Sequence, residues 1–177
     1  MRSTLPAALA ACIAFTAPAL ADLKAGTAAP DFTAQATQGG KRFTFRLTEA
    51  LKKGPVVVYF YPAAFTSGCT IEAHDFAEAM PRFTALGATV IGISHDDIAT
   101  LDKFSTSECQ SKFPVASDAD RRIMKAYDAT MPVLSYASRT SYVIAPDGRI
   151  AYAYSDMAPE GHISNTLKAV AALKPAR

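Results

Sequence analysis

The amino-acid sequence predicts a single α/β domain in which helices flank a central mixed β-sheet. Strand-like and helix-like patterns alternate through the middle of the chain, and a hairpin followed by a helix closes it. The 177 residues contain no internal linker, and this length is enough for one domain with a buried core. Because 50% of the residues are hydrophobic and 19% are charged, the composition is that of an ordinary globular protein.

A short hairpin and a short helix are expected ahead of the central strands. Residues 30–32 open an extended segment, and the glycine pair at 39–40 marks a turn before the alternating residues 43–45. Residues 47–53 have room for one or two helical turns, which the Gly-Pro pair that follows should end.

A strand, a short loop and a long helix are predicted next. Residues 56–61 are continuously apolar, which is typical of a central strand covered on both faces. A loop of small and hydroxylated residues then leads to Cys69 in the first turn of a helix. The apolar spacing stays helical as far as Phe83, although Pro81 is expected to kink the helix, and Gly87 should end it.

The remaining chain continues to alternate strands and helices. Asp96 or Asp97 should cap one helix, Asp118 should cap the next, and residues 131–137 are predicted to be loop. A tight-turn pattern at residues 146–148 indicates a hairpin near the end. We expect strands at 88–93, 113–116, 140–145 and 149–154, and helices from about 98 to the Cys109 region, from 118 to 127 and over 159–172.

The first 21 residues are predicted to be a cleaved signal peptide, which leaves residues 22–177 as the exported domain. Arg2 supplies the positive start, residues 5–20 are almost wholly apolar, and residues 19–21 form a small-x-small cleavage signal. The apolar run is too short and too broken by proline to span a membrane. We therefore expect a periplasmic protein without stable membrane contact. The alternative is lipidation at Cys12, because residues 9–12 resemble a lipobox.

The cysteines raise the main chemical question. Removing the signal peptide leaves Cys69 and Cys109 in an oxidising compartment, where two cysteines are more often paired than free. The start of a helix favours a thiolate, and lowering a thiol pKa from about 8.5 to about 6 makes most of it ionised at neutral pH. The alternative is that Cys69 is an inert core residue and Thr66 a helix cap.

The residues around Cys69 resemble a known family. Residues 62–69, PAAFTSGC, fit the P-x-x-x-T-x-x-C pattern of peroxiredoxins, and the longer run FYPAAFTSGCTIEAHDF is similar to the PrxQ, or bacterioferritin-comigratory-protein, branch of AhpC/TSA-type redoxin domains. The similarity extends to residues 29–32, 139–144 and 147–148. It implies a thioredoxin-like fold and a thiol-dependent peroxidase that reduces hydrogen peroxide and organic hydroperoxides without a cofactor or metal.

The resemblance also implies a role for each site residue. Cys69 would be the peroxidatic cysteine, whose thiolate attacks the peroxide and becomes a sulfenic acid. Thr66 would hydrogen-bond the peroxide, and Pro62 would shield the pocket from water. Arg139 would hold the thiolate and polarise the peroxide, since preorganised donors lower the barrier where charge moves. Glu72, one helical turn beyond Cys69, would orient Arg139.

One position departs from the PrxQ pattern. Many PrxQ proteins carry a second cysteine five residues after the first, but this chain has His74 there, which we interpret as a partly exposed helix residue. Cys109 is then the expected resolving cysteine, which would form an intramolecular disulfide with Cys69. The alternative is a one-cysteine enzyme that an external thiol recycles. His95 and His162 are interpreted as ordinary loop or cap residues.

Other classes of protein fit the sequence less well. A thioredoxin-like disulfide oxidoreductase needs a Cys-x-x-Cys pair, which Cys69 lacks. A metal-binding redoxin module could use Cys69, His74, His95 and Cys109, but their spacing matches no firm site. The net charge of +2, without any basic run, gives no support for nucleic-acid binding. The expected partners are a peroxide and a thioredoxin-like or other thiol reductant, and the expected oligomeric state is a monomer or homodimer.

Overall fold

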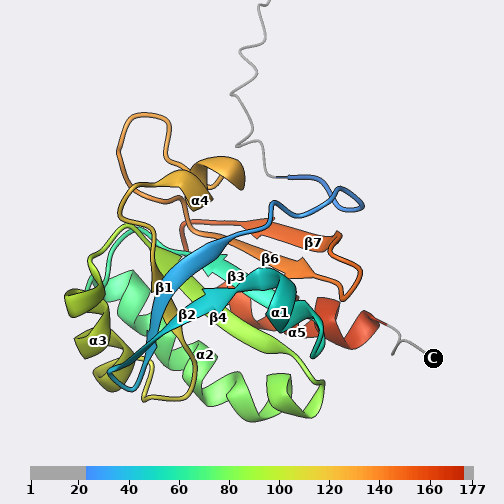
Figure 1. Cartoon of the computed structure of the whole chain (residues 1–177), viewed down its shortest axis with the longest axis horizontal. Helices are drawn as coiled ribbons and strands as arrows, with labels where there is room; N and C mark the ends of the chain where they lie inside the picture. Colours follow the sequence, from blue (N-terminus) through green and yellow to red (C-terminus); the bar gives the residue numbers. More distant parts are fainter. Residues whose placement is uncertain (1–22, 174–177) are drawn as a thin grey trace, which may run out of the picture.

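The centre of the fold is a seven-stranded sheet with the strand order β2-β1-β5-β4-β3-β6-β7 (Figure 1). The computed structural model describes residues 23–173, so the predicted signal peptide lies outside the described residues. Strand β4 (Thr89–Ser94) pairs in parallel with β3 (Val56–Phe60) and β5 (Val115–Ser117). The other pairs are antiparallel, which confirms the predicted mixed sheet.

The hairpins and helices also lie where the sequence places them, within one to three residues at most ends. The remaining strands are β1 (Thr33–Gln38), β2 (Lys41–Arg46), β6 (Thr140–Ile144) and β7 (Ile150–Ser155), and the helices are α1 (Leu47–Leu51), α2 (Ser67–Ala85), α3 (Ile98–Ser107), α4 (Arg122–Ala126) and α5 (Glu160–Ala172).

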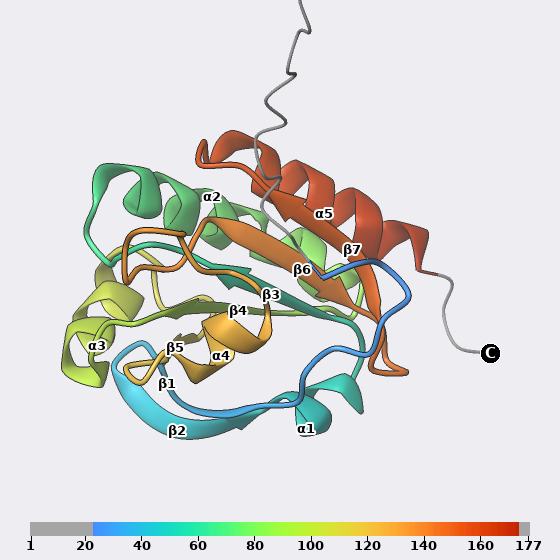
Figure 2. The same ribbon diagram turned by 90° about the horizontal axis from the view of Figure 1, so that it is seen from above.

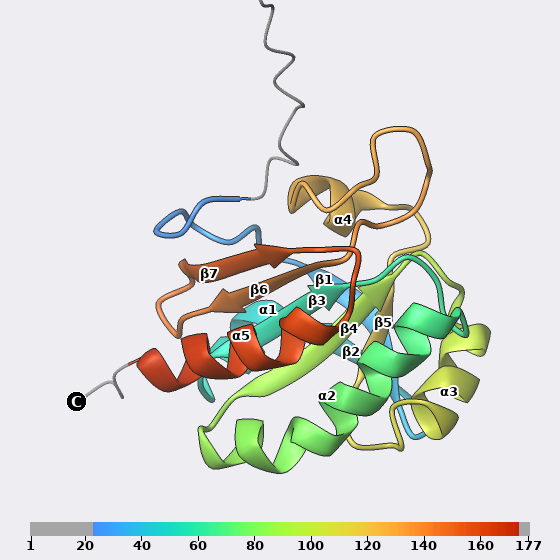
Figure 3. The same cartoon turned by 180° about the vertical axis from the view of Figure 1, so that it is seen from behind.

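Two apolar cores lie on opposite faces of the sheet. Helices α2, α3 and α5 bury one face, and this core contains both Cys69 and Cys109. Helices α1 and α4 cover the other face. Seen edge-on in Figure 2, α2 and α5 lie on one side of the sheet and α1 on the other, and Figure 3 shows α2 and α5 across the first face. The site therefore belongs to the α2–α3–α5 side.

Strand β3 is buried on both faces and leads into the loop and helix that contain Cys69. Every side chain from Val56 to Phe60 is buried, as its continuous apolar pattern predicts. The ring of Tyr59 extends over Gly92 of β4, where an added Cβ would lie 2.6 Å from the ring. Such close approach requires glycine at position 92.

Helix α2 runs through Pro81 and ends at Ala85, close to Gly87 as expected, with buried Phe76 and Phe83 on either side of the proline. One local expectation needs correction. Asp118 does not stand at the N-cap position of α4, which Arg121 occupies in a left-handed conformation. Its carboxylate nevertheless accepts hydrogen bonds from backbone N–H groups at the start of α4, so it caps the helix from farther upstream.

Candidate active site

Cys69 lies in the first turn of α2, where the backbone N–H groups have no helical acceptor. The N-cap residue, Thr66, has an extended backbone, and its carbonyl accepts the first helical hydrogen bond, from the N–H of Thr70, at 2.9 Å. The side chain of Cys69 is 1% exposed. A buried thiol at the positive end of a helix of 19 residues has an environment that stabilises negative charge on sulfur.

The loop between β3 and α2 is held in place by contacts with α3 and with the segment after β4. Phe65 has a left-handed backbone (φ 65°), which is costly for an aromatic residue, and its ring packs edge-on against Phe104 of α3 at 5.3 Å. The N–H of Ala64 donates to the carboxylate of Asp96 at 2.8 Å, and the hydroxyl of Ser94 donates to the same oxygen at 2.7 Å. Sequence reasoning placed Asp96 only as a possible helix cap, but it anchors the loop that carries the site.

Arg139 reaches the thiol from a distant part of the chain. It directly precedes β6, and its side chain is only 4% exposed. Its Nη2 donates to the sulfur of Cys69 at 3.5 Å, and its Nε donates to the carbonyl of Met157 at 3.0 Å. Gly68 lies beneath the guanidinium, where an added Cβ would stand 3.0 Å from Nη2. The planar fork of arginine is therefore fixed in place before any substrate arrives.

Glu72 completes this buried charged group. Its Oε2 accepts a hydrogen bond from Nη1 of Arg139, so the structure brings these two residues together as the resemblance implied. Burial raises the pKa of Glu72 to about 8, and the nearby charge of Arg139 limits the rise. The pair is buried on both sides, and breaking it by removing one partner would leave an uncompensated charge.

Thr66 and Pro62 belong to the segment that leads from β3 to Cys69. Thr66 is exposed, and its hydroxyl donates to the carbonyl of Ala63 at 3.0 Å rather than to the sulfur. Thr66 occupies the N-cap position of α2, but its side chain makes no hydrogen bond to the backbone N–H groups of the helix. Its oxygen keeps lone pairs that can accept from a peroxide. Pro62 is half-buried at the end of β3.

Cys109 is buried in the same core but in a different electrostatic setting. It follows the C-terminal end of α3, and Gln110 and Ser111 after it both have left-handed backbones. Burial, with the charge of Glu108 as a second cause, raises the pKa of Cys109 far above its ordinary value. Both cysteines are free thiols in this structure. The sulfurs of both also influence the pKa of the buried Tyr59 and Tyr61, so the two thiols lie near the same pair of rings.

Two histidines differ in a way that the sequence did not reveal. His74 is partly exposed on α2, as expected, and its Nε2 lies 3.0 Å from the carboxylate of Glu108. The interpretation of His162 as an ordinary loop or cap residue is wrong. Its ring is fully buried and hydrogen-bonds Ser141 at 2.8 Å and the carbonyl of Asp156 at 2.9 Å. The sequence carries no signal for this, because the contacts join segments that are separate in the chain.

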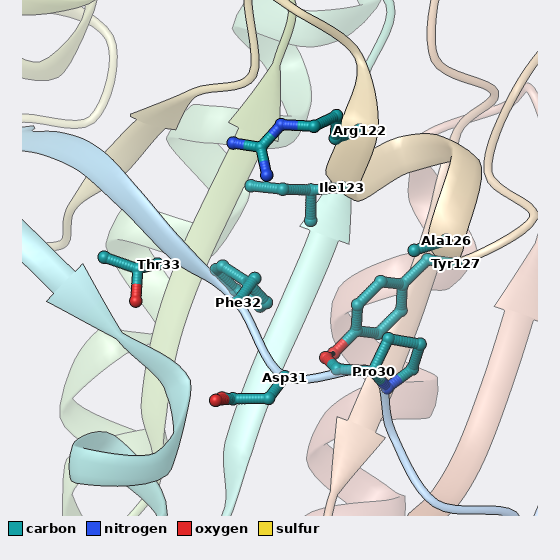
Figure 4. Close-up of a pocket in the computed structure, with 8 residues that line it drawn as sticks. All are labelled: Pro30, Asp31, Phe32, Thr33, Arg122, Ile123, Ala126 and Tyr127. Carbon is teal, nitrogen blue, oxygen red and sulfur yellow. Dashed lines mark hydrogen bonds between the residues drawn. The ribbon is translucent and has the colours of Figure 1, made fainter.

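The part of the chain that the structure describes, residues 23–173, contains no group of three or more His, Cys, Asp or Glu side chains that could hold a metal ion. Among its helices, none is both long and apolar enough to cross a membrane. A pocket of about 490 Å³ lies on the opposite face of the sheet from Cys69, between the segment before β1 and α4 (Figure 4). Its lining residues are Pro30, Asp31, Phe32, Thr33, Arg122, Ile123, Ala126 and Tyr127.

Fold and site together define a class of protein. A thioredoxin-like domain that presents a buried cysteine at a helix N-terminus to a fixed guanidinium is built for thiol chemistry on a small oxidant. The chain belongs to the AhpC/TSA family, whose model matches residues 25–153.

Relatives and solved structures agree with this placement. Peroxiredoxin Q of rice chloroplasts (Oryza sativa subsp. japonica) is 36% identical over 84% of this chain and 67% of its own length. Peroxidoxin BcpB from Mycobacterium tuberculosis superposes with a TM-score of 0.79 at 29% identity, covering 86% of this chain and 99% of that protein. The bacterioferritin comigratory protein of Xanthomonas campestris, whose structures were described for its alkyl peroxide reduction activity, superposes with a TM-score of 0.70 at 28% identity over 80% and 90% of the two chains.

Proposed function

We propose that this thiol-dependent peroxidase uses Cys69 as its peroxidatic residue. The observation that carries the proposal is the 3.5 Å contact between Nη2 of Arg139 and the Cys69 sulfur at the N-terminus of α2. In that position the thiolate is stabilised by the helix end and by a fixed cation, and both remain in place when charge moves during the reaction.

The first step consumes one peroxide. The Cys69 thiolate attacks one oxygen of ROOH, the O–O bond breaks, and the sulfur becomes a sulfenic acid while RO⁻ leaves and takes up a proton as ROH. Charge passes from sulfur to the leaving oxygen, so donors that face both atoms lower the barrier. Arg139 is the donor at the sulfur, and the hydroxyl of Thr66, in the loop before α2, orients the peroxide in this proposal.

We propose that Cys109 resolves the sulfenic acid. Its thiol attacks the Cys69 sulfur, releases water and forms a disulfide, which an external dithiol then reduces. Two Cα atoms must come within about 7 Å for such a bond. Consecutive left-handed residues at Gln110 and Ser111 each cost about 1–2 kcal/mol, so the turn that holds Cys109 has strain that opening it would release. The first turn of α2 must open as well.

Treatment with one equivalent of hydrogen peroxide, followed by peptide mapping, tests the resolving step. We expect a Cys69–Cys109 disulfide. A sulfenic acid that persists at Cys69 while Cys109 stays a free thiol would contradict the proposal and support the one-cysteine alternative, in which an external thiol attacks Cys69 directly.

We further propose that the substrates include organic hydroperoxides. The loop before Arg139 exposes apolar side chains, with Val133 at 93%, Leu134 at 54% and Tyr136 at 42%. Such a surface suits an alkyl group, and the Xanthomonas relative is described for alkyl peroxide reduction. Stopped-flow oxidation with hydrogen peroxide and with an alkyl hydroperoxide tests this. Oxidation by the alkyl hydroperoxide at a rate far below that of hydrogen peroxide would oppose it.

We also propose that the protein acts in the periplasm. The predicted signal peptide, residues 1–21, supports export to the periplasm, and the thiol reductant would then be an exported one. Fractionation of cells that produce the full chain, with sequencing of the mature N-terminus, tests both points. We expect a periplasmic protein that begins at Asp22, whereas a lipidated Cys12 or an unprocessed cytoplasmic chain would contradict cleavage after Ala21.

A further inference from the structure

His162 is a fully buried polar residue to which the reaction described so far assigns no role. It stands in the first turn of α5, next to Gly161, where an added Cβ would lie 2.2 Å from the hydroxyl of Tyr154. Only glycine allows that close approach, which seats the start of α5 against β7. The ring of His162 packs edge-on against the Tyr154 ring at 4.8 Å. The ring is thus held in one place by packing.

The hydrogen bonds of His162 fix where its proton lies. Its Nε2 stands 2.9 Å from the backbone carbonyl of Asp156, which can only accept, so Nε2 carries the hydrogen. Its Nδ1 stands 2.8 Å from the hydroxyl of Ser141. Burial is the main cause that lowers the pKa of His162, which favours the neutral ring, and the hydroxyl then donates to Nδ1.

The acceptor of the Nε2–H belongs to a short segment that grips Arg139. The N–H of Asp156 donates to the backbone carbonyl of Arg139 at 3.3 Å, and the carbonyl of Met157 accepts from Nε of Arg139 at 3.0 Å. Residues 156–157 therefore hold both the backbone and the guanidinium of Arg139. His162 ties this segment to α5.

His162 also lies beside the second partner of Arg139. Its Nδ1 is 3.8 Å from Oε1 of Glu72, and this oxygen has no hydrogen-bond partner among the described residues. The groups that face the ring are then Glu72 from α2, Arg139 before β6, Asp156 and Tyr154. A positive charge on His162 would place a second cation next to Arg139 and turn Nδ1 into a donor that competes for Glu72.

We propose that His162, as the neutral ring with its proton on Nε2, is a positioning residue that fixes the Arg139 guanidinium against Cys69 through the Asp156–Met157 backbone. This inference rests on the proposed role of Cys69 and Arg139 in peroxide reduction. It predicts that the Nε2–H donor, rather than ring volume alone, sustains the rate of Cys69 oxidation.

Two variants separate the donor from the rest of the ring. Glutamine can place an amide N–H near the position of Nε2, whereas asparagine is one methylene shorter and reaches only the position of Nδ1. We expect His162→Asn to lower the rate constant of Cys69 oxidation by about ten- to a hundredfold, and His162→Gln to stay within about threefold of the parent.

The controls distinguish positioning from general destabilisation. His74→Asn makes the same change on the exposed side of α2 and should leave the rate unchanged, and unfolding curves report how much stability each variant loses. Equal rate constants for His162→Asn and His162→Gln, or a His162→Asn rate within about twofold of the parent, would overturn the inference. Cys69→Ser is measured in parallel, so that loss of activity there shows that the proposed function stands even if the inference fails.

A further test uses the unaltered protein, so its result does not depend on whether a variant folds. Nitrogen-15 NMR of the histidine side chains should show that the His162 ring is neutral at neutral pH and carries its proton on Nε2. Slow exchange of that proton with solvent is expected, because the ring is fully buried. A proton on Nδ1, or an imidazolium at neutral pH, would contradict the inference.

Discussion

Cys69 and Cys109 are equally buried, yet the protein surrounds them with opposite charges. Cys69 lies at the N-terminus of α2 and faces Arg139, whereas Cys109 follows the C-terminus of α3, next to Glu108. A helix N-terminus and a cation favour a thiolate, while a helix C-terminus and a carboxylate disfavour it. The comparison teaches that burial alone does not set the reactivity of a thiol. We propose that the placement of fixed charge makes Cys69, rather than Cys109, the cysteine that reacts with the peroxide.

The largest expected effect tests which cysteine is the nucleophile. Cys69→Ser should abolish peroxide consumption, since a serine hydroxyl at this site is not ionised. Cys109→Ser should leave the first oxidation of Cys69 within about twofold of the parent and stop only the disulfide. Stopped-flow kinetics and peptide mass spectrometry measure the two steps. Peroxide consumption near the parent level in Cys69→Ser would show that Cys69 is not the nucleophile and would contradict the different roles proposed for the two cysteines.

The next effect tests the cation beside Cys69. Arg139→Lys keeps the charge but loses the fork that contacts Cys69, Glu72 and the Met157 carbonyl, so the rate of Cys69 oxidation should fall about a hundredfold. Arg122→Lys, at an exposed position on α4, is the matched control and should change nothing. A rate for Arg139→Lys close to that of the control would mean that charge alone is sufficient.

A third prediction concerns the carboxylate that supports Arg139. Because the pKa of Glu72 is raised from 4.5 to about 8 in the folded state, the folded protein binds more protons than the unfolded chain between these values. Stability should therefore fall as the pH rises through this window, by up to about 1.4 kcal/mol per pH unit, and Glu72→Gln should remove that slope. Urea unfolding across this pH range measures it.

The exposed Glu78 provides the control for this slope. Glu78→Gln is a matched change on the same helix and should keep the pH dependence of the parent. If Glu72→Gln retained the full slope, Glu72 would not be the group that causes the pH dependence, and the raised pKa assigned to its carboxyl group would be wrong.

The smallest expected effect tests the charge beside Cys109. Glu108→Gln removes the acid next to this thiol and weakens the contact with His74, which is partly exposed. Because exposed pairs contribute about 1 kcal/mol or less, alkylation of Cys109 in the reduced protein should speed up by no more than about fivefold. Mass spectrometry follows the modified thiol, with Glu78→Gln as the control. Slower alkylation in Glu108→Gln would show that Glu108 does not suppress the reactivity of Cys109.

Local sequence was sufficient for much of this comparison. The apolar run of β3, the small and hydroxylated loop, and the helical spacing after Cys69 placed the thiol at a helix start, because each depends on neighbours within a few residues. The turn chemistry of residues 146–148 likewise placed the β6–β7 hairpin. Glu72 was expected near Arg139 only through the family resemblance.

Neighbouring residues in the sequence do not place Arg139 beside Cys69 or His162 beside Ser141. Arg139 is separated from Cys69 by 70 positions, and His162 from Ser141 by 21, so their contacts follow from how β6 and α5 pack on α2 and β7. The sequence determined that a cysteine begins a buried helix in an AhpC/TSA-type domain. Only the packing of distant segments decided that this cysteine faces a cation and that His162 is buried, because burial and Coulomb interactions depend on distance in space rather than along the chain.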